Sequence, residues 1–171
     1  MRKILILSVS MLFAGCGYTL RSAQNLQYKT IFIPVFTNRI SIQDSYSGYS
    51  LYYQGLEVDL DSILKNRFRY DGNVLPVSNR TDADIALIGA VLSYDKNALS
   101  YASNEDVNEY RVIVRSEVCL VKNGNELWKE VLEGETSYLT TGPNAKSEAQ
   151  ALRTALEDLS RKIVDRVVSD W

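Results

Sequence analysis

The chain has 171 residues, a hydrophobic fraction of 46% and a net charge of −2 at neutral pH, values that suit one globular domain with a real core. It contains no histidine and only two cysteines, so the usual catalytic triads and thiol–histidine pairs are excluded. Lysine and arginine form no basic block, and nucleic-acid binding, which depends on such clusters, is disfavoured.

Residues 1–15 have the parts of an export signal. Arg2 and Lys3 make a basic start, an apolar run extends from Ile4 to Phe13, and Ala14-Gly15 supplies the small residues of a cleavage site. The apolar run is about ten residues long, roughly half of what a membrane-spanning helix needs. A permanent transmembrane anchor is therefore not expected.

The segment Phe13-Ala14-Gly15-Cys16 resembles the cleavage site of bacterial lipoproteins, in which the residue after the cut is a cysteine that receives lipid. Those proteins prefer Leu where this chain has Phe13, and the alternative is an ordinary secretory signal followed by a chance cysteine. The resemblance implies a multiply acylated Cys16. Several acyl chains hold a protein durably, because each buried methylene contributes about 0.8 kcal/mol. Gly17 replaces the Asp that often signals inner-membrane retention, so the outer membrane is expected.

Cleavage before Cys16 removes two positive charges and leaves 156 residues, so the net charge falls from −2 to −4. We predict that residues 16–29 form the lipidated N-terminus and a polar tether, and that residues 30–171 form a single domain. Cys119 is then the only possible free thiol. It lies in the apolar run SEVCLV, which predicts a buried, inert side chain.

The first half of the predicted domain contains a strand, a tyrosine-rich loop and a helix. Thr30–Phe36 is β-branched and aromatic, which is typical of a strand, and Pro34 favours an edge or a strand end. From Leu56 to Phe68 apolar residues recur at helical spacing. Acidic residues near the start of this segment and basic residues near its end suit the helix dipole. The sequence YDGN over 70–73 then predicts a turn.

Extended segments fill the middle of the chain. A short one is predicted within 73–78, and longer ones over Asp84–Asp95, Glu109–Val121 and Glu126–Tyr138. The first long segment is nearly all apolar, which predicts a strand covered on both faces, whereas the second alternates. Asn123-Gly124 tolerates positive φ and predicts a hairpin between the second and third.

The C-terminal segment has the clearest helical pattern. Ser147 and Gln150 have the spacing of a capping box, and an apolar stripe runs from Leu152 to Val167. Two i,i+4 ion pairs are expected on the wet face: Glu157–Arg161 and Asp158–Lys162. The element order β-α-β-β-β-α predicts an α+β fold, with two helices packed on one face of a small, mainly antiparallel or mixed β-sheet.

Several of these pieces occur in the order and spacing of a known family. They are CGYTLR after the signal, IFIPVFTN, GLEVDLDSILKNRF, ADIALIGAVLSY, EYRVIVRSEVCL, LW and a capped last helix ending in W. The ordered set resembles the LptE family of lipopolysaccharide-assembly lipoproteins over essentially the whole chain. The resemblance implies two helices against a small sheet and no enzymatic activity. It also implies a plug inside the outer-membrane β-barrel LptD that helps deliver lipopolysaccharide to the cell-surface leaflet.

Two lysines are candidates for contact with lipopolysaccharide. Family members use basic loop residues for this purpose, which the resemblance carries over first to Lys146, just before the last helix, and then to Lys96. The segment ASNEDVNE over 102–109 is acidic where a basic residue is wanted. A solvated surface lysine is the alternative at both positions.

Four tyrosines within eight residues, Tyr46, Tyr49, Tyr52 and Tyr53, precede the first helix. Tyrosine combines a large contact area with a polar tip and is favoured at interfaces. One interpretation is a loop that contacts the barrel wall, and the other is a loop that folds back over the sheet and buries two of the four rings.

No other chemistry is predicted. The pairs of carboxylates in VDLD (58–61) and TDAD (81–84) lack further ligands at a credible spacing, so no metal site is expected, and no cofactor beyond the lipid on Cys16. The alternative function is a lipid-binding or transporter-accessory lipoprotein of a different envelope system. A lipid carrier needs an apolar cavity between sheet and helices, whereas a plug has a packed core.

Overall fold

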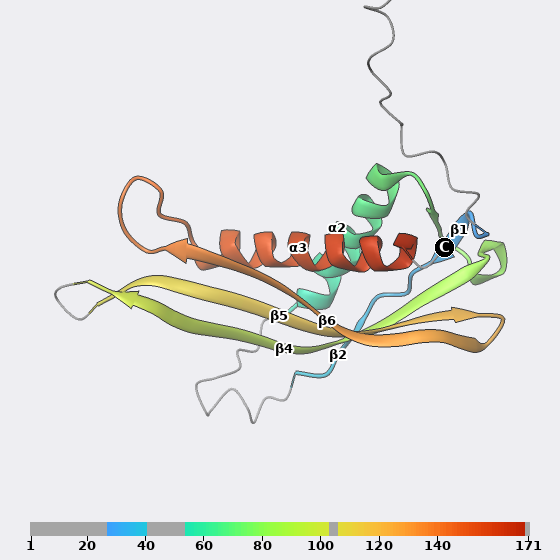
Figure 1. The fold of residues 1–171 in the computed structure, drawn as a ribbon, viewed down its shortest axis with the longest axis horizontal. Coiled ribbons are helices and arrows are strands. Elements are labelled where there is room, and N and C mark those ends of the chain that lie inside the picture. The colour runs from blue at the N-terminus through green and yellow to red at the C-terminus, as the bar shows by residue number, and fades with distance from the viewer. Residues whose placement is uncertain (1–26, 41–53, 103–105, 170–171) are drawn as a thin grey trace, which may run out of the picture.

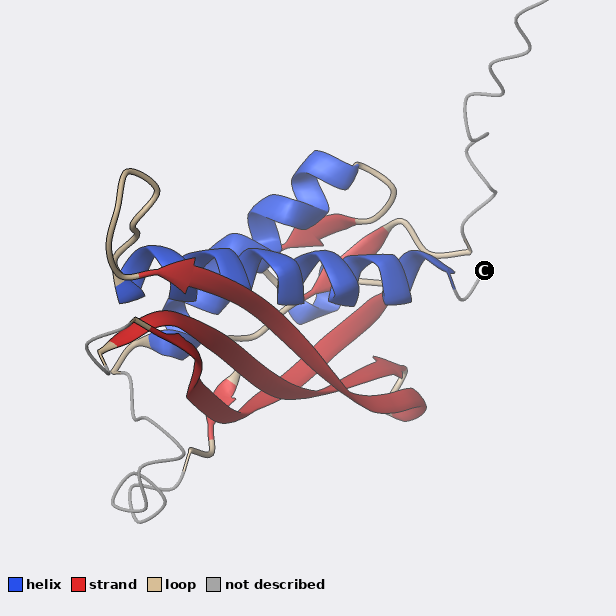
Figure 2. Ribbon diagram, turned by 60° about the vertical axis from the view of Figure 1, so that its left-hand side comes forward, coloured by secondary structure: helices blue, strands red, loops and turns tan. Residues whose placement is uncertain are grey.

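The computed structural model describes residues 27–40, 54–102 and 106–169. Two helices lie on one side of a mixed, six-stranded sheet (Figures 1 and 2). The strand order is β3-β1-β4-β5-β6, with β2 beside β4. The strands are β1 (Thr30–Phe32), β2 (Thr37–Asn38), β3 (Leu75–Val77), β4 (Ile85–Tyr101), β5 (Val107–Lys122) and β6 (Asn125–Leu139), and the helices are α2 (Leu56–Asp71), α3 (Glu148–Ser169) and the short η3 (Arg80–Asp82). The predicted α+β fold class is confirmed.

The strand predicted over Thr30–Phe36 ends at Phe32, and the next short strand begins only at Thr37, so the predicted extent is wrong. β1 lies between β3 and β4, parallel to both, and is therefore interior rather than at an edge. Pro34 follows β1 and lacks the N–H that a continuing ladder requires. The chain resumes pairing at β2, again parallel to β4.

The three long strands form an antiparallel meander, and Asn123 and Gly124 make its second turn with φ of 48° and 84°. This confirms the predicted hairpin. β4 continues to Tyr101, beyond the predicted end at Asp95, because its last residues remain paired with β5. The prediction that β4 is covered on both faces is wrong as well. Ile88 is 49% exposed, since both helices lie on the opposite face.

α2 buries the predicted apolar face, including Leu60 and Phe68, and the N–H of Gly72 after it donates to the Phe68 carbonyl. α3 begins with the predicted capping box. The Ser147 N–H donates to Gln150 Oε1 at 2.9 Å, and the Gln150 N–H donates to Ser147 Oγ at 3.2 Å. These reciprocal bonds satisfy two donors that helix geometry leaves unpaired.

The wet face of α3 carries ion pairs that differ in part from the prediction. Asp158–Lys162 is confirmed at 2.8 Å. Glu157–Arg161 is wrong, because Glu157 pairs with Arg153 at 3.2 Å, while Arg161 lies between Asp158 at 2.6 Å and Asp165 at 3.2 Å. Two acids flank Arg161 at favourable helical spacings, so its guanidinium turns away from Glu157.

α3 packs directly on β6. A Cβ atom added at Gly134 would lie 2.2 Å from the Ala155 carbonyl oxygen and 2.5 Å from the Leu159 Cβ. Ser116 of β5 and Ser160 of α3 are fully buried small side chains that also permit a close approach. At this place the helix rests on the sheet backbone.

No helix within the described ranges combines the length and the apolar character that a bilayer span demands.

Candidate functional site

The structure places Lys96 in a cluster that joins the sheet to the start of α3. We call Lys96, Tyr94, Tyr110, Tyr138 and Glu148 the Lys96 cluster. The Lys96 ammonium lies 2.5 Å from the Glu148 carboxylate and 4.6 Å from the centroid of the Tyr110 ring. The Tyr94 hydroxyl donates to Glu148 at 2.7 Å, and Tyr110 stacks on Tyr138 with centroids 5.8 Å apart.

The electrostatics of the cluster favour its charged form. Burial raises the pKa of Glu148, but hydrogen bonds from Lys96 and Tyr94 outweigh it and hold that pKa below the ordinary value. Burial lowers the pKa of Lys96, yet the bond and charge of Glu148 prevail and raise it. Burial also raises the pKa of Tyr138, against the opposing influence of Lys96. Lys96 is thus engaged within the protein, not simply solvated.

Lys146 lies two residues before Glu148, at the end of the loop that leads into α3. Its N–H donates to the Leu139 carbonyl at 3.0 Å, which holds the loop against the end of β6. The residue is exposed, and its ammonium makes no ion pair with any residue that the structure describes. The two candidate lysines therefore gather at one end of the molecule, around the start of α3, and only Lys146 offers its charge to solvent.

Sequence reasoning missed the partners of Lys96. Glu148 directly follows the capping residue Ser147 and has the appearance of an ordinary first-turn acid, which the helix dipole favours. Its contact with Lys96 spans 52 positions, and neither periodicity nor a motif signals a contact at that separation. The alternation of β5 does place Tyr110 on the face toward the helices, and this was the one sequence signal for a partner of Lys96.

We predict that the Lys96–Glu148 pair makes stability depend on pH. The folded pKa of Glu148 is depressed, so its contribution is present above the ordinary carboxyl value of 4.5 and is lost as pH falls through the lower folded pKa. The folded pKa of Lys96 is raised, so its contribution is present below 10.5 and is lost as pH rises through the higher folded pKa. Urea unfolding of Glu148→Gln against the native chain, from about pH 2 to 11, measures this difference.

The expected difference for Glu148→Gln is no more than about 1 kcal/mol at neutral pH, because the carboxylate is partly exposed and screened. It should shrink toward both ends of the pH range. Glu157→Gln is the matched control, since Glu157 is an exposed α3 acid paired within its own helix. Equal pH profiles for the two variants would contradict a special role for the Lys96 pair.

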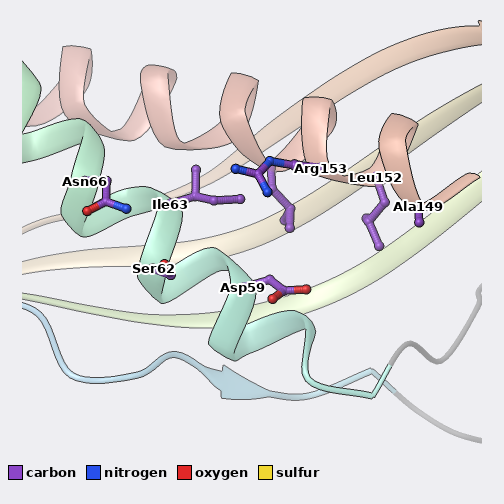
Figure 3. Close-up of a pocket in the computed structure, with 8 residues that line it drawn as sticks. Asp59, Ser62, Ile63, Asn66, Ala149, Leu152 and Arg153 are labelled. Atoms are coloured by element: carbon purple, nitrogen blue, oxygen red, sulfur yellow. The ribbon is translucent and has the colours of Figure 1, made fainter. Parts of the chain in front are cut away.

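A groove of about 300 Å³ separates the two helices. Figure 3 shows Arg153 extending from α3 toward α2, with Asp59 on the facing helix. None of the predicted site residues lines it. The lining residues are Asp59, Ser62, Ile63, Asn66, Ala149, Leu152, Arg153 and Leu156.

The helix-free face of the meander carries a network of ion pairs. Arg115 of β5 contacts Asp95 of β4 at 2.6 Å and Glu133 of β6 at 3.2 Å. Glu117 likewise accepts from Arg39 at 3.3 Å and Lys129 at 3.0 Å. This face therefore carries paired charges over three strands, beside exposed apolar side chains such as Ile88 and Val131.

Cys119 lies on the same open face, so the predicted burial is wrong. The residue is half-buried, and its Sγ donates to Glu126 at 3.5 Å. Burial, together with the nearby Glu126 carboxylate, raises the pKa of the thiol, which disfavours the reactive thiolate. The predicted strand is present, but Cys119 faces away from the helices, because its neighbours Val118 and Leu120 are the residues that point to them.

Several predicted residues lie outside the described ranges: Cys16, Tyr46, Tyr49, Tyr52 and Tyr53. The lipid anchor and the tyrosine interface therefore stay predictions. In the part of the chain that is described, no group of three cysteine or acidic side chains converges as metal ligands do.

The chain shares its fold with several solved structures. The hypothetical protein CT253 from Chlamydia trachomatis superposes with a TM-score of 0.55 at 13% identity, covering 81% of this chain and 95% of that one. The minor lipoprotein from Acinetobacter baumannii gives 0.51 at 16% identity, with coverage of 84% and 94%. Protein XCC0632 from Xanthomonas campestris gives 0.57 at 10% identity, with coverage of 83% and 85%. At these identities the likeness concerns the fold alone.

No curated protein sequence matches this chain. The family model described as lipopolysaccharide-assembly LptE, in contrast, matches residues 28–170. That range includes both helices and all six strands, and it begins at Tyr28, whose side chain is already part of the core. Because the match extends over nearly the whole chain, the protein belongs to the LptE family of lipopolysaccharide-assembly proteins.

Proposed function

We propose that this protein is a lipid-anchored outer-membrane lipoprotein that assembles inside the LptD β-barrel and helps deliver lipopolysaccharide to the cell-surface leaflet, without enzymatic activity. Membership of the family supports association with lipopolysaccharide-transport machinery. In this proposal Cys16 carries the lipid, and the domain faces the periplasm or the barrel lumen. The tyrosines at 46, 49, 52 and 53 meet the barrel wall.

The close packing of α3 on β6 is the observation that carries the proposal over its alternative. A lipid carrier needs space between helices and sheet, but at Gly134 that interface has no room for a single methyl group. The groove that exists lies between the helices and is bordered by charged side chains such as Asp59 and Arg153. A packed body of this kind suits a plug better than a carrier.

The open face of the sheet also fits a barrel lumen. The interior surface of large outer-membrane barrels is polar, and the helix-free face offers paired charges such as Arg115–Asp95 and Lys129–Glu117. A surface whose charges are already paired can enter a polar, water-containing lumen without leaving an isolated ion uncompensated.

The test of the partner is capture of the tagged, full-length protein from detergent-solubilised outer membranes, with bound proteins identified by mass spectrometry. We expect a large β-barrel of the lipopolysaccharide translocon at a near-equal amount. Tyr49→Ser with Tyr52→Ser should reduce that capture, whereas Tyr101→Ser, at a tyrosine that is 66% exposed on β4, should not. Capture of no barrel, or of an inner-membrane transporter, would favour the alternative function.

We predict that Lys146→Asp weakens binding of purified lipopolysaccharide by about tenfold. The charge reversal replaces a solvent-facing cation by an anion that repels lipid phosphates, and one lost charge-assisted contact corresponds to about this factor. Lys129→Asp is the control, because Lys129 is paired with Glu117 on the open face. Unchanged binding by Lys146→Asp in a titration would assign the contact elsewhere.

A further inference from the structure

Arginines are paired unevenly over this molecule. Outside residues 67–80, every arginine that the structure describes has a carboxylate within 4 Å: Arg39, Arg111, Arg115, Arg153, Arg161 and Arg166. Arg67, Arg69 and Arg80 have no such carboxylate among the described residues. In a protein where arginines otherwise pair with acids, these three are left available for an external anion.

The three unpaired arginines lie at one end of the fold. Arg67 and Arg69 are in the last turns of α2, and Arg80 begins η3, which follows β3 and contacts β1. Figure 1 shows the end of α2 together with β1 on the side of the molecule opposite the loop between β6 and α3. We call this region, residues 27–30 and 67–84, the tether-side end.

Among the described residues, the N–H groups of these arginines contact neutral partners, not carboxylates. Arg67 Nε is buried without a hydrogen-bond partner among the described residues, and its guanidinium lies 5.7 Å from the centroid of the Tyr70 ring. Arg69 donates to the neutral amide oxygen of Asn66 at 2.9 Å, and Arg80 donates to the Ala83 carbonyl at 3.4 Å. Each guanidinium therefore keeps N–H groups that can donate hydrogen bonds to phosphate oxygens.

The acids of the same end are engaged by other donors. Asp84 accepts the N–H groups of Lys29 at 2.7 Å and Thr30 at 3.0 Å, which ties the start of β1 to β4. Asp71 accepts from the Asn73 amide at 2.8 Å, and Asp82 accepts from Asn79 at 3.1 Å. These carboxylates accept hydrogen bonds from nearby backbone and amide N–H groups, and they do not neutralise the arginine charges by direct contact.

Apolar surface accompanies the charges. Tyr70 is 84% exposed and Leu75 is 52% exposed, both within the tether-side end. Tyrosine beside arginine is a combination suited to the membrane–water interface, where the ring reaches the headgroup level and the cation meets phosphate.

The chain enters the fold at this same end. Tyr28 is 6% exposed and receives the Lys122 ammonium both on its hydroxyl, at 3.0 Å, and over its ring, at 4.5 Å. Gln27 lies eleven positions after Cys16, and a chain of that length spans at most about 40 Å. A lipid on Cys16 would thus hold this end, rather than the Lys146 end, near the bilayer, at a high effective concentration.

We propose that the tether-side end is a second membrane-contact site, in which Arg67, Arg69 and Arg80 bind the phosphates of anionic phospholipids while Tyr70 and Leu75 enter the headgroup region. The inference rests on the proposed lipidation of Cys16. An acyl anchor joined to basic residues is a recognised combination, and each basic residue at an anionic surface contributes roughly a fivefold gain in partition. The contact would fix the orientation of the domain beneath its anchor.

The test uses the full-length protein as purified from membranes, in a Cys119→Ser background, reconstituted with vesicles of phosphatidylethanolamine and phosphatidylglycerol. One sample carries a fluorophore at Ser78→Cys, directly after β3 in the tether-side end, and another at Asn144→Cys, in the loop before α3. Both positions are exposed. Quenching by a nitroxide on the lipid headgroup reports contact. Flotation of the vesicles reports anchoring independently.

We expect several-fold stronger quenching at residue 78 than at residue 144, and loss of that excess in vesicles of pure phosphatidylcholine. Arg69→Glu with Arg80→Glu, both at exposed positions, should reduce the quenching at residue 78 several-fold, to the level at residue 144. The matched control is Arg153→Glu with Arg161→Glu, which makes the same charge change at exposed positions of α3 and should leave the quenching at residue 78 unchanged. Circular dichroism melts verify folding of each variant.

The outcomes separate the two proposals. Protein that floats with the vesicles but shows equal quenching at residues 78 and 144, or no response to Arg69→Glu with Arg80→Glu, is lipid-anchored without the second contact, which overturns this inference alone. Protein that floats with neither type of vesicle overturns the anchor and the inference together.

Discussion

Replacing Gly134 by alanine is expected to lower the free energy of unfolding by about 3 kcal/mol, the upper part of the range for overpacked cores. The added methyl group would lie 2.2 Å from the Ala155 carbonyl oxygen and 2.5 Å from the Leu159 backbone nitrogen. Because both are main-chain atoms of α3, no rotamer change can relieve the clash. The helix must lift from the sheet, which also separates buried side chains such as Leu156 and Ile163 from β5 and β6.

Urea unfolding of the purified protein measures this loss as a shift of the midpoint at constant slope. Ser137→Ala is the control, because Ser137 lies on the open face of the same strand and is exposed. It should change stability by less than about 0.5 kcal/mol. A Gly134→Ala protein as stable as the control would show that α3 does not rest on the sheet backbone as the structure has it.

Replacing Phe36 by alanine is expected to cost about 3–5 kcal/mol, the usual range for a fully buried phenylalanine. Phe36 is 2% exposed, and its ring lies over Gly89 of β4, where an added Cβ would approach within 2.3 Å. Gly89 has no side chain with which to fill the space, so the cavity should persist. The loss should loosen the segment between β1 and β2, which Phe36 holds to the core.

The neighbour Val35 supplies the matched control, since it is 51% exposed. Val35→Ala should change the unfolding free energy by less than about 0.5 kcal/mol in the same urea titration. A second measurement probes the contact itself. Gly89→Ala should destabilise the native chain, because its methyl group would clash with the Phe36 ring. The same substitution should be better tolerated in a Phe36→Leu protein, because the obstacle is a side chain and not the backbone. A small effect of Phe36→Ala, equal to that of Val35→Ala, would contradict the predicted packing.

The elements that depend on near neighbours were predictable. The apolar spacing from Leu56 to Phe68, the capping box of Ser147 and Gln150, and the turn at Asn123-Gly124 are interactions over two to four positions, and all three appear in the structure. Such patterns determine which segments become helices and hairpins, because 3.6-residue and two-residue periods decide which side chains share a face.

The candidate site was only half predictable. The sequence pointed to Lys96 and Lys146, and the structure brings both to the start of α3, yet Lys96 is already paired with Glu148. The availability of a charge depends on its partner, and this partner belongs to another element. The same applies to Arg67, Arg69 and Arg80. That they have no acidic partner among the described residues can be recognised only from the tertiary structure.

By itself, then, the sequence determined the fold class, the order of its main elements and the family of this protein, since each follows from local periodicity and from the arrangement of whole segments along the chain. The tertiary structure alone decided that β1 is interior, that Cys119 lies on the open face and that α3 approaches Gly134 without space for a methyl group. The physical reason is that register and packing distances arise between segments far apart in the chain, where a shift of one residue moves every side chain to the opposite face.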